Sequence, residues 1–270
     1  MTPLVLTLHV RPDQRLDLSP LVPHRLAGKS AAEIARIELQ TTRARVTVGD
    51  AFRIRPGDSQ LIRIENSCDR LDRIGCGMTD GAIEVEGDAG LEAGRLMAGG
   101  RLTISGSTGV CGASGMRGGT LVIAGSAGDR LGGPLAGETA GMRGGVVVVS
   151  GNAGNRAGDR MRRGTIIVEG AVGAHAGSRM IAGTLIVAGE AGPLPGYLMR
   201  RGTIVLAACA RRAPTFVGCG THDLVALRLM AQFVSEYSTK AASLVRKPLH
   251  RFAGDMAVSG KGEIFLAAED

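Results

Sequence analysis

Aromatic residues are scarce in this chain of 270 residues: tryptophan is absent, and the aromatic content is only 3%. A central stretch, residues 78–206, holds no phenylalanine at all. Apolar residues still make up 44% of the chain. A core can therefore form, but within the central stretch it must be narrow and filled by Val, Ile, Leu, Ala and Met. The phenylalanines lie outside this stretch, at Phe52, Phe216, Phe233, Phe252 and Phe265.

Long apolar runs and paired cysteine motifs are also missing. No apolar stretch approaches the roughly 18 residues of a membrane span. The beginning, Met1 to Leu4, lacks the charged segment and apolar run of a signal peptide. The number of cysteines is odd and no C-x-x-C occurs, which predicts a cytoplasmic protein with reduced thiols and no membrane partner. The cysteines are Cys68, Cys76, Cys111, Cys209 and Cys219.

Lysine is rare although the net charge is +7. Arginine supplies almost all of the positive charge, which suggests a GC-rich genome. The bias argues against a hyperthermophile, whose proteins are enriched in Lys and Glu. Lysine occurs only at Lys29, Lys240, Lys247 and Lys261.

Glycine, in contrast, is abundant, with 42 residues, far above the usual share of about 7%. A phrase of the form Met-x-x-Gly recurs through the central stretch in steps of 19, 19, 26, 19, 19 and 19 residues. A fixed period near 20 residues is the signature of a solenoid, in which each repeat forms one coil. The phrase begins at Met78, Met97, Met116, Met142, Met161, Met180 and Met199.

A second phrase, Gly-x-x-Gly-x-x-x-Gly, follows the same period. One copy is broken, because Ala113 takes the third place after Gly106 and Gly109. We expect these glycines to mark turns with positive φ or faces that leave no room for a Cβ atom. They are Gly87, Gly90, Gly94, Gly125, Gly128, Gly132, Gly151, Gly154, Gly158, Gly170, Gly173, Gly177, Gly189, Gly192 and Gly196.

Short β-branched runs, such as residues 120–123 and 165–168, lie between the glycines and predict strands. One strand in 19 residues leaves too little chain for a helix in every coil. The sequence therefore predicts an all-β solenoid, a right-handed parallel β-helix of about seven coils. A leucine-rich horseshoe is the alternative, but its Leu/Asn signature is missing. The expected units are a cap at 1–60, the β-helix at 61–210 and a C-terminal arm at 211–270.

Both arms show local signals. A solenoid needs a cap over its first coil, and the N-terminal arm offers a strand near residues 4–10. The arm also offers a helix start with Ser30 as N-cap and Glu33 at the capping-box position. In the C-terminal arm, residues 262–266 predict one more strand.

The predicted strands are apolar on both faces, so an outward column that includes Val122, Val148 and Val205 needs a cover. Residues 222–246 offer a helix for this role, with Thr221 as N-cap and Pro248 as stop signal. We expect the helix to lie against the solenoid; docking on another protein is the alternative. Its apolar stripe is Leu227, Met230, Val234, Tyr237, Ala241 and Leu244.

The single step of 26 residues places a surplus of seven residues near 133–139. Such an insertion protrudes from one face of a regular solenoid. Loops of this kind often make contacts, and a neutral surface loop is the equal alternative.

A search for catalytic, cofactor-binding or metal-ligating residues gives none. Cys219 and His222 have ligand-like spacing but lack a second pair, and His175 stands alone, so core or surface roles are favoured. Carboxylates cluster only around 84–92, whereas a β-helical glycosidase or lyase would stack them on adjacent coils. Neither G-x-G-x-x-G before a helix nor the complete phosphate-binding phrase G-x-x-x-x-G-K-[ST] occurs, because Gly28-Lys29-Ser30 has Pro23 where that phrase needs its first glycine.

Arginine is the one charged residue type that follows the repeat, beside the methionines. Stacked coils would bring these side chains close together, which is unfavourable unless anions or acidic residues intervene. They form either a solvated edge, with partners such as Asp159 and Glu169, or a basic ladder for an acidic protein surface or polyanionic ligand. Nucleic acid is disfavoured because no stacking aromatics are interleaved. The arginines are Arg117, Arg143, Arg160, Arg162, Arg163, Arg179, Arg200 and Arg201.

The glycine phrases resemble the C-terminal β-helical domain of the glutamate synthase large chain. They resemble still more closely the C subunit of formylmethanofuran dehydrogenase. The similarity to the C subunit extends to both arms and so covers nearly the whole chain. The arm segments are Ala27-Gly28-Lys29-Ser30, Val48-Gly49-Asp50-Ala51-Phe52, Arg251-Phe252-Ala253-Gly254-Asp255 and Gly260-Lys261-Gly262-Glu263-Ile264.

This resemblance implies one of two settings. In methanogenic archaea the subunit belongs to a tungsten or molybdenum formylmethanofuran dehydrogenase. In methylotrophic bacteria it belongs to a formyltransferase/hydrolase complex, which moves a formyl group from tetrahydromethanopterin to a methanofuran-type carrier and releases formate. The composition favours the bacterial setting, a part of C1 metabolism that oxidises formaldehyde.

The resemblance also implies that catalysis lies on other subunits and that this chain is structural. The partners would be an amidohydrolase-like hydrolytic subunit, a formyltransferase subunit and a dehydrogenase-B-like subunit. The carrier, tetrahydromethanopterin and a metal, expected to be zinc, would belong to those partners and no cofactor to this chain. A stand-alone β-helical enzyme and a glutamate-synthase-like scaffold domain remain as rival hypotheses.

Overall fold

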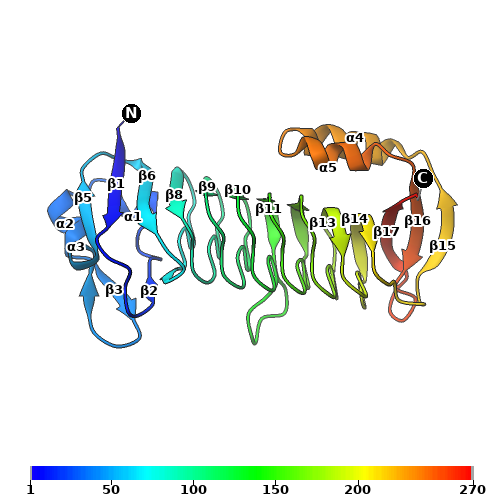
Figure 1. The fold of residues 1–270 in the computed structure, drawn as a ribbon, viewed down its shortest axis with the longest axis horizontal. Helices are drawn as coiled ribbons and strands as arrows, with labels where there is room; N and C mark the ends of the chain where they lie inside the picture. Colours follow the sequence, from blue (N-terminus) through cyan, green and yellow to red (C-terminus); the bar gives the residue numbers. More distant parts are fainter. Residues whose placement is uncertain (1, 269–270) are drawn as a thin grey trace.

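The computed structural model describes residues 2–268. The molecule is elongated, with a folded arm at each end and a row of regular repeats between them (Figure 1). Most of the secondary structure is β, dominated by a sheet of 13 strands in the order β15-β16-β17-β14-β13-β12-β11-β10-β9-β8-β6-β1-β5. A chain with this many periodic glycines and few aromatics thus forms mainly strands, as predicted.

The N-terminal arm closes one end of the sheet. Strand β1 (Pro3–Leu8) pairs with β5 (Phe52–Arg55) in antiparallel and with β6 (Asp58–Ser67) in parallel orientation. The predicted strand and the predicted capping box of Ser30 and Glu33 are both confirmed. The remaining elements of the arm are β2 (Leu16–Asp17), α1 (Pro23–Leu26), α2 (Ala31–Ala35), β3 (Glu38–Thr41), β4 (Val46–Thr47), α3 (Val48–Ala51) and β7 (Leu71–Asp72).

Each repeat contributes one strand to the long sheet, and the strands from β6 to β14 pair in parallel with their neighbours. The register follows the period of the sequence, since Leu121 lies opposite Val147, which lies opposite Ile166. The strands are β8 (Ala82–Gly87), β9 (Arg101–Ile104), β10 (Thr120–Ile123), β11 (Arg143–Val149), β12 (Arg163–Val168), β13 (Thr184–Ala191) and β14 (Arg201–Cys209).

The interior of the repeats is narrow and aliphatic, as predicted. Inward side chains of the strands, for example Leu121 and Ile166, are fully buried. The seven methionines of the repeat phrase, from Met78 to Met199, are buried as well. A second line of parallel bridges runs along another side of the repeats, through Ala89, Thr108, Ala127, Ala153, Val172 and Ala191.

Two glycines illustrate why the period depends on this residue. Gly119 directly precedes β10 with φ +81°, and a Cβ atom there would lie 2.7 Å from the carbonyl oxygen of Gly100. Gly151 has an ordinary φ, but its Cβ would lie 2.6 Å from the carbonyl oxygen of Gly125. Such distances are far below van der Waals contact, so only glycine lets neighbouring repeats approach this closely.

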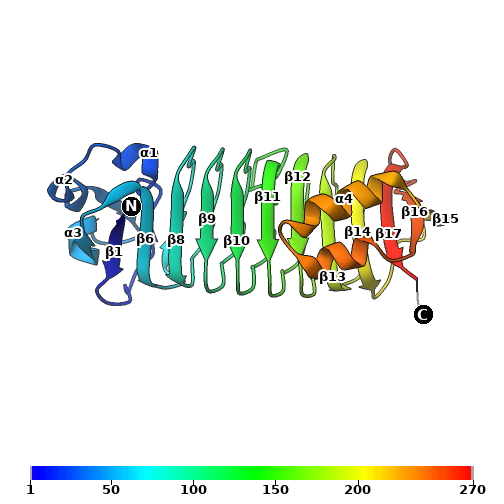
Figure 2. The same ribbon diagram turned by 90° about the horizontal axis from the view of Figure 1, so that it is seen from above.

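The C-terminal arm closes the other end. Strand β17 (Lys261–Ala267) continues the parallel sheet beside β14, and β16 (Leu249–Gly254) and β15 (Val217–Thr221) follow in antiparallel orientation. The predicted final strand is therefore confirmed. Between β15 and β16, the helices α4 (Val225–Ser235) and α5 (Thr239–Val245) form a pair that lies over β12, β13 and β14 (Figure 2).

The single helix predicted at 222–246 is wrong in detail. The helix breaks after Ser235, because the Ser238 hydroxyl accepts from the N–H of Ala241 at 3.1 Å and caps a second helix. The N-cap of α4 is Leu224, without a side-chain cap. Thr221 is instead the last residue of β15.

The cover itself is confirmed. Val148, Ile167, Ile186 and Val205 lie in register on the outer face of the sheet and form a buried cluster with residues of α4 and α5. Val122, the first member of the predicted column, remains partly exposed. The helix pair therefore covers only part of this apolar face. Among residues 2–268, no helix has both the length and the apolar character needed to cross a membrane.

Candidate interaction site

Backbone hydrogen bonds between repeats bring three of the predicted arginines into one line. The residue after each repeat methionine donates its N–H to the carbonyl oxygen of the previous repeat's methionine: Arg117 and Arg143 at 2.7 Å, Arg162 at 2.8 Å. Ile181 occupies the next place, and Arg200 follows it with a bond of 2.8 Å. The stacking expected for these arginines is therefore real, with one apolar interruption.

Two more arginines extend the basic surface sideways. Arg143 lies opposite Arg163 across β11 and β12, and Arg201 lies opposite Lys261 across β14 and β17. All six of these arginines are exposed, and within residues 2–268 none forms an ion pair. They are Arg117, Arg143, Arg162, Arg163, Arg200 and Arg201.

The arginines that precede the methionines behave differently. The guanidinium of Arg179 pairs with Asp159, a carboxylate that is only 2% exposed and that also accepts from the hydroxyl of Ser178 at 2.8 Å. Arg160 donates to the carbonyl oxygen of Glu138 at 3.2 Å. The expectation that Asp159 pairs with one of the arginines is therefore confirmed for Arg179. Glu169, the other expected partner, contacts Ser238 and Lys240 of the C-terminal arm instead.

Two adjoining hollows lie among these arginines. One, of about 290 Å³, is lined by Thr139, Arg160, Arg179, Ile181, Leu198, Arg200 and Val258. The other, of about 390 Å³, is lined by Arg162, Arg163, Ile181, Ala182, Arg200, Arg201, Ser259 and Lys261. Because guanidinium groups bind carboxylates and phosphates through paired hydrogen bonds, this arginine-rich surface can hold an acidic group.

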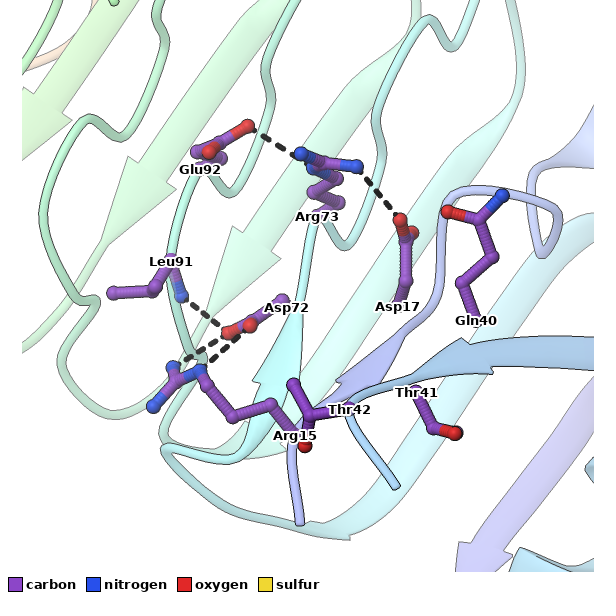
Figure 3. Close-up of a pocket in the computed structure, with 9 residues that line it drawn as sticks. All are labelled: Arg15, Asp17, Gln40, Thr41, Thr42, Asp72, Arg73, Leu91 and Glu92. Atoms are coloured by element: carbon purple, nitrogen blue, oxygen red, sulfur yellow. Dashed lines mark hydrogen bonds and ion pairs between the residues drawn. The ribbon is translucent and has the colours of Figure 1, made fainter. Parts of the chain in front are cut away.

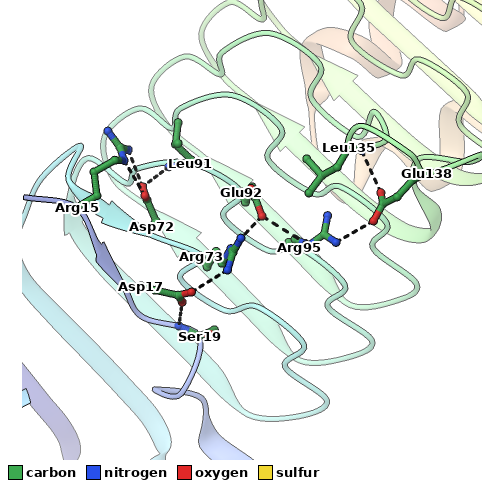
Figure 4. Close-up of polar contacts among 10 residues, drawn as sticks. All are labelled: Arg15, Asp17, Ser19, Asp72, Arg73, Leu91, Glu92, Arg95, Leu135 and Glu138. Atoms are coloured by element: carbon green, nitrogen blue, oxygen red, sulfur yellow. Dashed lines mark hydrogen bonds and ion pairs between the residues drawn. The ribbon is translucent and has the colours of Figure 1, made fainter. Parts of the chain in front are cut away.

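A chain of alternating charges runs along another edge of the repeats (Figure 4). Arg73 contacts Asp17 at 2.8 Å and Glu92 at 3.0 Å. Arg95 contacts Glu92 at 3.6 Å and Glu138 at 2.8 Å. These charges therefore connect the N-terminal arm, the first repeats and the inserted loop. Sequence analysis missed them because paired members are up to 56 residues apart.

The inserted loop at 133–139 folds back through Glu138. Its carboxylate accepts from the N–H of Leu135 at 3.0 Å and from Arg95 at 2.8 Å. Burial by itself raises the pKa of Glu138, but these hydrogen bonds and the charges of Arg95 and Arg143 outweigh it and lower the pKa. These contacts hold the insertion to the body of the protein, and a role of the loop in binding a partner stays a prediction.

A hollow of about 230 Å³ lies at the junction of the N-terminal arm and the repeats (Figure 3). Arg15 binds Asp72 through two hydrogen bonds of 2.6 Å, which raise the pKa of its guanidinium. Asp72 also accepts from the N–H of Leu91 at 2.8 Å. The charged groups of this hollow are committed to one another, so they join the arm to the first repeats.

Residues considered for metal binding or catalysis make other contacts. His222 bonds the carbonyl oxygen of Cys219 at 2.6 Å, and His175 packs edge-on against Tyr197. Burial raises the pKa of the Cys111 thiol. Among residues 2–268, no group of three or more His, Cys, Asp or Glu residues is arranged to hold a metal ion.

The sequence analysis also missed a ladder of polar side chains between repeats. Asp88 accepts from the N–H of Ser107 at 2.7 Å, and Ser107 and Ser126 accept in the same way from the next repeat. Asn152 completes the ladder by accepting from the N–H of Ala171 at 2.8 Å. The sequence does hold a signal for this ladder, because each of these polar residues directly follows the first glycine of one copy of the Gly-x-x-Gly-x-x-x-Gly phrase.

Parallel stacked strands with an arginine-rich flank define this chain as an elongated β-repeat protein. No family model matches the sequence. The chain is 52% identical over 264 residues to the C subunit of the formyltransferase/hydrolase complex Fhc of Methylorubrum extorquens, covering 97% of this chain and 99% of that protein. The chain therefore belongs to this family of C subunits, and the resemblance inferred from the sequence is confirmed.

Two further similarities agree. A solved structure of the formyltransferase/hydrolase complex (FhcABCD) from Methylorubrum extorquens in complex with methylofuran holds a chain that matches with a TM-score of 0.94 and 43% identity, covering 98% of this chain and all of that one. The C subunit of the tungsten-containing formylmethanofuran dehydrogenase 2 of Methanococcus maripaludis is 31% identical over 93 residues, 34% of each chain.

Proposed function

We propose that this chain is a non-catalytic structural subunit of a formyltransferase/hydrolase complex. The complex would transfer formyl from tetrahydromethanopterin to a methanofuran-type carrier and release formate in the cytoplasm of a methylotroph that oxidises formaldehyde. The observation that carries the proposal is the 52% identity to an Fhc C subunit over 97% of the chain. The archaeal dehydrogenase is the weaker alternative, because that similarity spans only 34% of the chain.

In this role the central part acts as a stiff support, a right-handed parallel β-helix of about seven coils at 61–210. The parallel register from β6 to β14 supports this description. Residues 1–60 cap one end and residues 211–270 form the other arm. A support of this kind keeps catalytic subunits at constant separation.

The partners in this proposal are an amidohydrolase-like hydrolytic subunit, a formyltransferase subunit and a dehydrogenase-B-like subunit. The carrier, tetrahydromethanopterin and a zinc ion belong to those partners. The methanofuran-type carrier is supported by the solved structure of the related complex, which contains methylofuran. The exposed arginines of this chain would contact an acidic partner surface or a polyanionic ligand, which is consistent with the absence of ion pairs for six of them within residues 2–268.

The experiment is purification of the tagged chain from its host under native conditions. We expect a hetero-oligomer whose other members carry formyltransferase and hydrolase activity, with neither activity in the isolated chain. Recovery as a lone monomer would overturn the proposal. Turnover by the isolated chain would favour a stand-alone enzyme instead.

A further inference from the structure

Helix α4 is apolar on two opposite sides. Its inner side chains, Leu227, Ala231 and Val234, are buried in the cluster that covers the sheet. Its outer face carries a second apolar row at four-residue spacing, which we call the outer ridge. The ridge consists of Val225, Leu229 and Phe233, with exposed fractions of 66%, 62% and 41%.

The neighbouring helix α5 has no such ridge, although it covers the same sheet. Its inner residues, such as Ala241 and Leu244, are buried. Its outer residues are Thr239, Lys240 and Ser243, all polar and exposed. Both helices cover the same sheet. This role explains the apolar inner face and polar outer face of α5 and the apolar inner face of α4, but it does not explain the outer ridge of α4.

A helix that carries apolar rows on two opposite sides normally buries both of them. Residues at four-residue spacing form a continuous row, the kind that packs into the groove of another helix. Phe233 is supported by Tyr237, whose ring centroid lies 5.3 Å away. Aromatic residues held in this way are common anchors of protein interfaces.

The ridge could pack against a second copy of this chain or against a different protein. The area and the charge of the region decide between these two occupants. At these exposed fractions the three ridge side chains offer on the order of 300 Å², whereas a stable interface needs about 800 Å² from each partner. Symmetric pairing of two ridges is therefore too small. Residues 211–250 also carry six Arg or Lys and only two Asp or Glu, so two copies would repel each other.

We propose that the outer ridge is the docking site for an apolar helical surface with an acidic rim on another subunit of the complex. This inference rests on the proposed function, since it names where one partner binds. Neighbouring parts of the helix pair complete the area, including the exposed Ala226 and Arg228 and a hollow of about 360 Å³ at the start of α4. The ridge supplies the central apolar contact and the surrounding basic residues meet the acidic rim.

The test uses the full chain, tagged and co-expressed with the three other subunits of its host's complex. Leu229→Lys and the double variant Val225→Lys/Phe233→Lys are compared with the control Ser243→Lys, which adds positive charge on the outer face of α5. Because all these positions are exposed, thermal melting of each isolated variant should match the unchanged chain. We expect the ridge variants to bind one partner subunit at least tenfold more weakly, and the control to bind normally.

A photo-crosslinking residue in place of Phe233 gives a second measurement that does not depend on the lysine variants. It should capture a single partner subunit in the assembled complex. Normal assembly of both ridge variants, or a crosslink only to a second copy of this chain, overturns the docking site and leaves the proposed function intact. If the unchanged chain is recovered alone, both proposals fail.

Discussion

Arg95 and Glu138 lie in direct contact, 2.8 Å apart, although 43 residues separate them in the sequence. Their ion pair joins the first repeats to the inserted loop, and both side chains are largely buried. The insertion is thus held to the body of the protein by one defined pair of charges. This geometry makes the pair a measurable contributor to stability.

Replacing Glu138 by Gln should destabilise the protein by about 1–3 kcal/mol, because the largely buried guanidinium of Arg95 loses the nearer of its two carboxylate partners. Urea unfolding at neutral pH measures the change. The exposed pair of Arg228 and Asp223 is the control, and Asp223→Asn should cost clearly less than Glu138→Gln because solvent screens this pair. Equal effects at the two positions would mean that the loop contact contributes no more than a surface pair.

The same carboxylate predicts a dependence of stability on pH. The pKa of Glu138 is lowered in the folded protein, so its contribution is present above the unfolded value of about 4.3. That contribution is lost as the pH falls through the lower folded pKa. In urea titrations from pH 6 down to pH 3, Glu138→Gln should lose less stability than the unchanged protein. Parallel curves would exclude this group as a source of acid sensitivity.

Reversing the charge of Arg117, Arg143 and Arg162 tests the arginine-rich surface. If it binds an acidic partner or polyanion, the triple change to Glu should weaken assembly or ligand affinity at least tenfold at low salt, with a smaller effect at high salt. Native mass spectrometry of the complex at two salt concentrations measures it. Arg45→Glu, at a side chain that is 92% exposed on the N-terminal arm, is the control. Unchanged assembly and affinity at low salt would identify the arginines as a solvated edge.

Glycine can be required for its positive φ or for the lack of space for a Cβ atom. Substituting two glycines with similar positive φ distinguishes these two causes. Gly28→Ala has φ +75° and no atom within 4 Å of the new Cβ, so it should cost about 1–2 kcal/mol from backbone strain alone. Gly119→Ala adds a Cβ at 2.7 Å from a carbonyl oxygen and should cost roughly 1–3 kcal/mol more. Thermal unfolding compares the two. Similar losses of stability for the two variants would show that neighbouring repeats can move apart to accommodate the added Cβ atom at little cost.

The repeats could be predicted because their information is local. The period of Met-x-x-Gly and the β-branched runs give the strands, and the register of Leu121 with Val147 follows from the repeat spacing. The capping box of Ser30 and Glu33 is equally local. The break between α4 and α5 was missed, since Ser238 interrupts no apolar position of the helical stripe and acts as a cap where Glu169 and the sheet hold it.

The arginine-rich surface was likewise predictable only in its local part. Backbone stacking of Arg117, Arg143 and Arg162 follows from the period. The pairing of Arg179 with Asp159, across 20 residues, depends on how neighbouring repeats turn. The sequence grouped all eight arginines together, but the structure leaves six exposed without ion pairs in residues 2–268 and commits the other two to specific partners.

The amino-acid sequence alone determined the repeat, the strand positions and the family, because each depends on short-range spacing that any stacked repeat must preserve. The first two glycines of the phrase mark positions where neighbouring backbones lie too close for a Cβ atom, and the third has positive φ. Only the tertiary structure decided which charges are paired and which face of α4 remains uncovered. Those properties depend on distances between residues far apart in the chain, where no local pattern constrains the outcome.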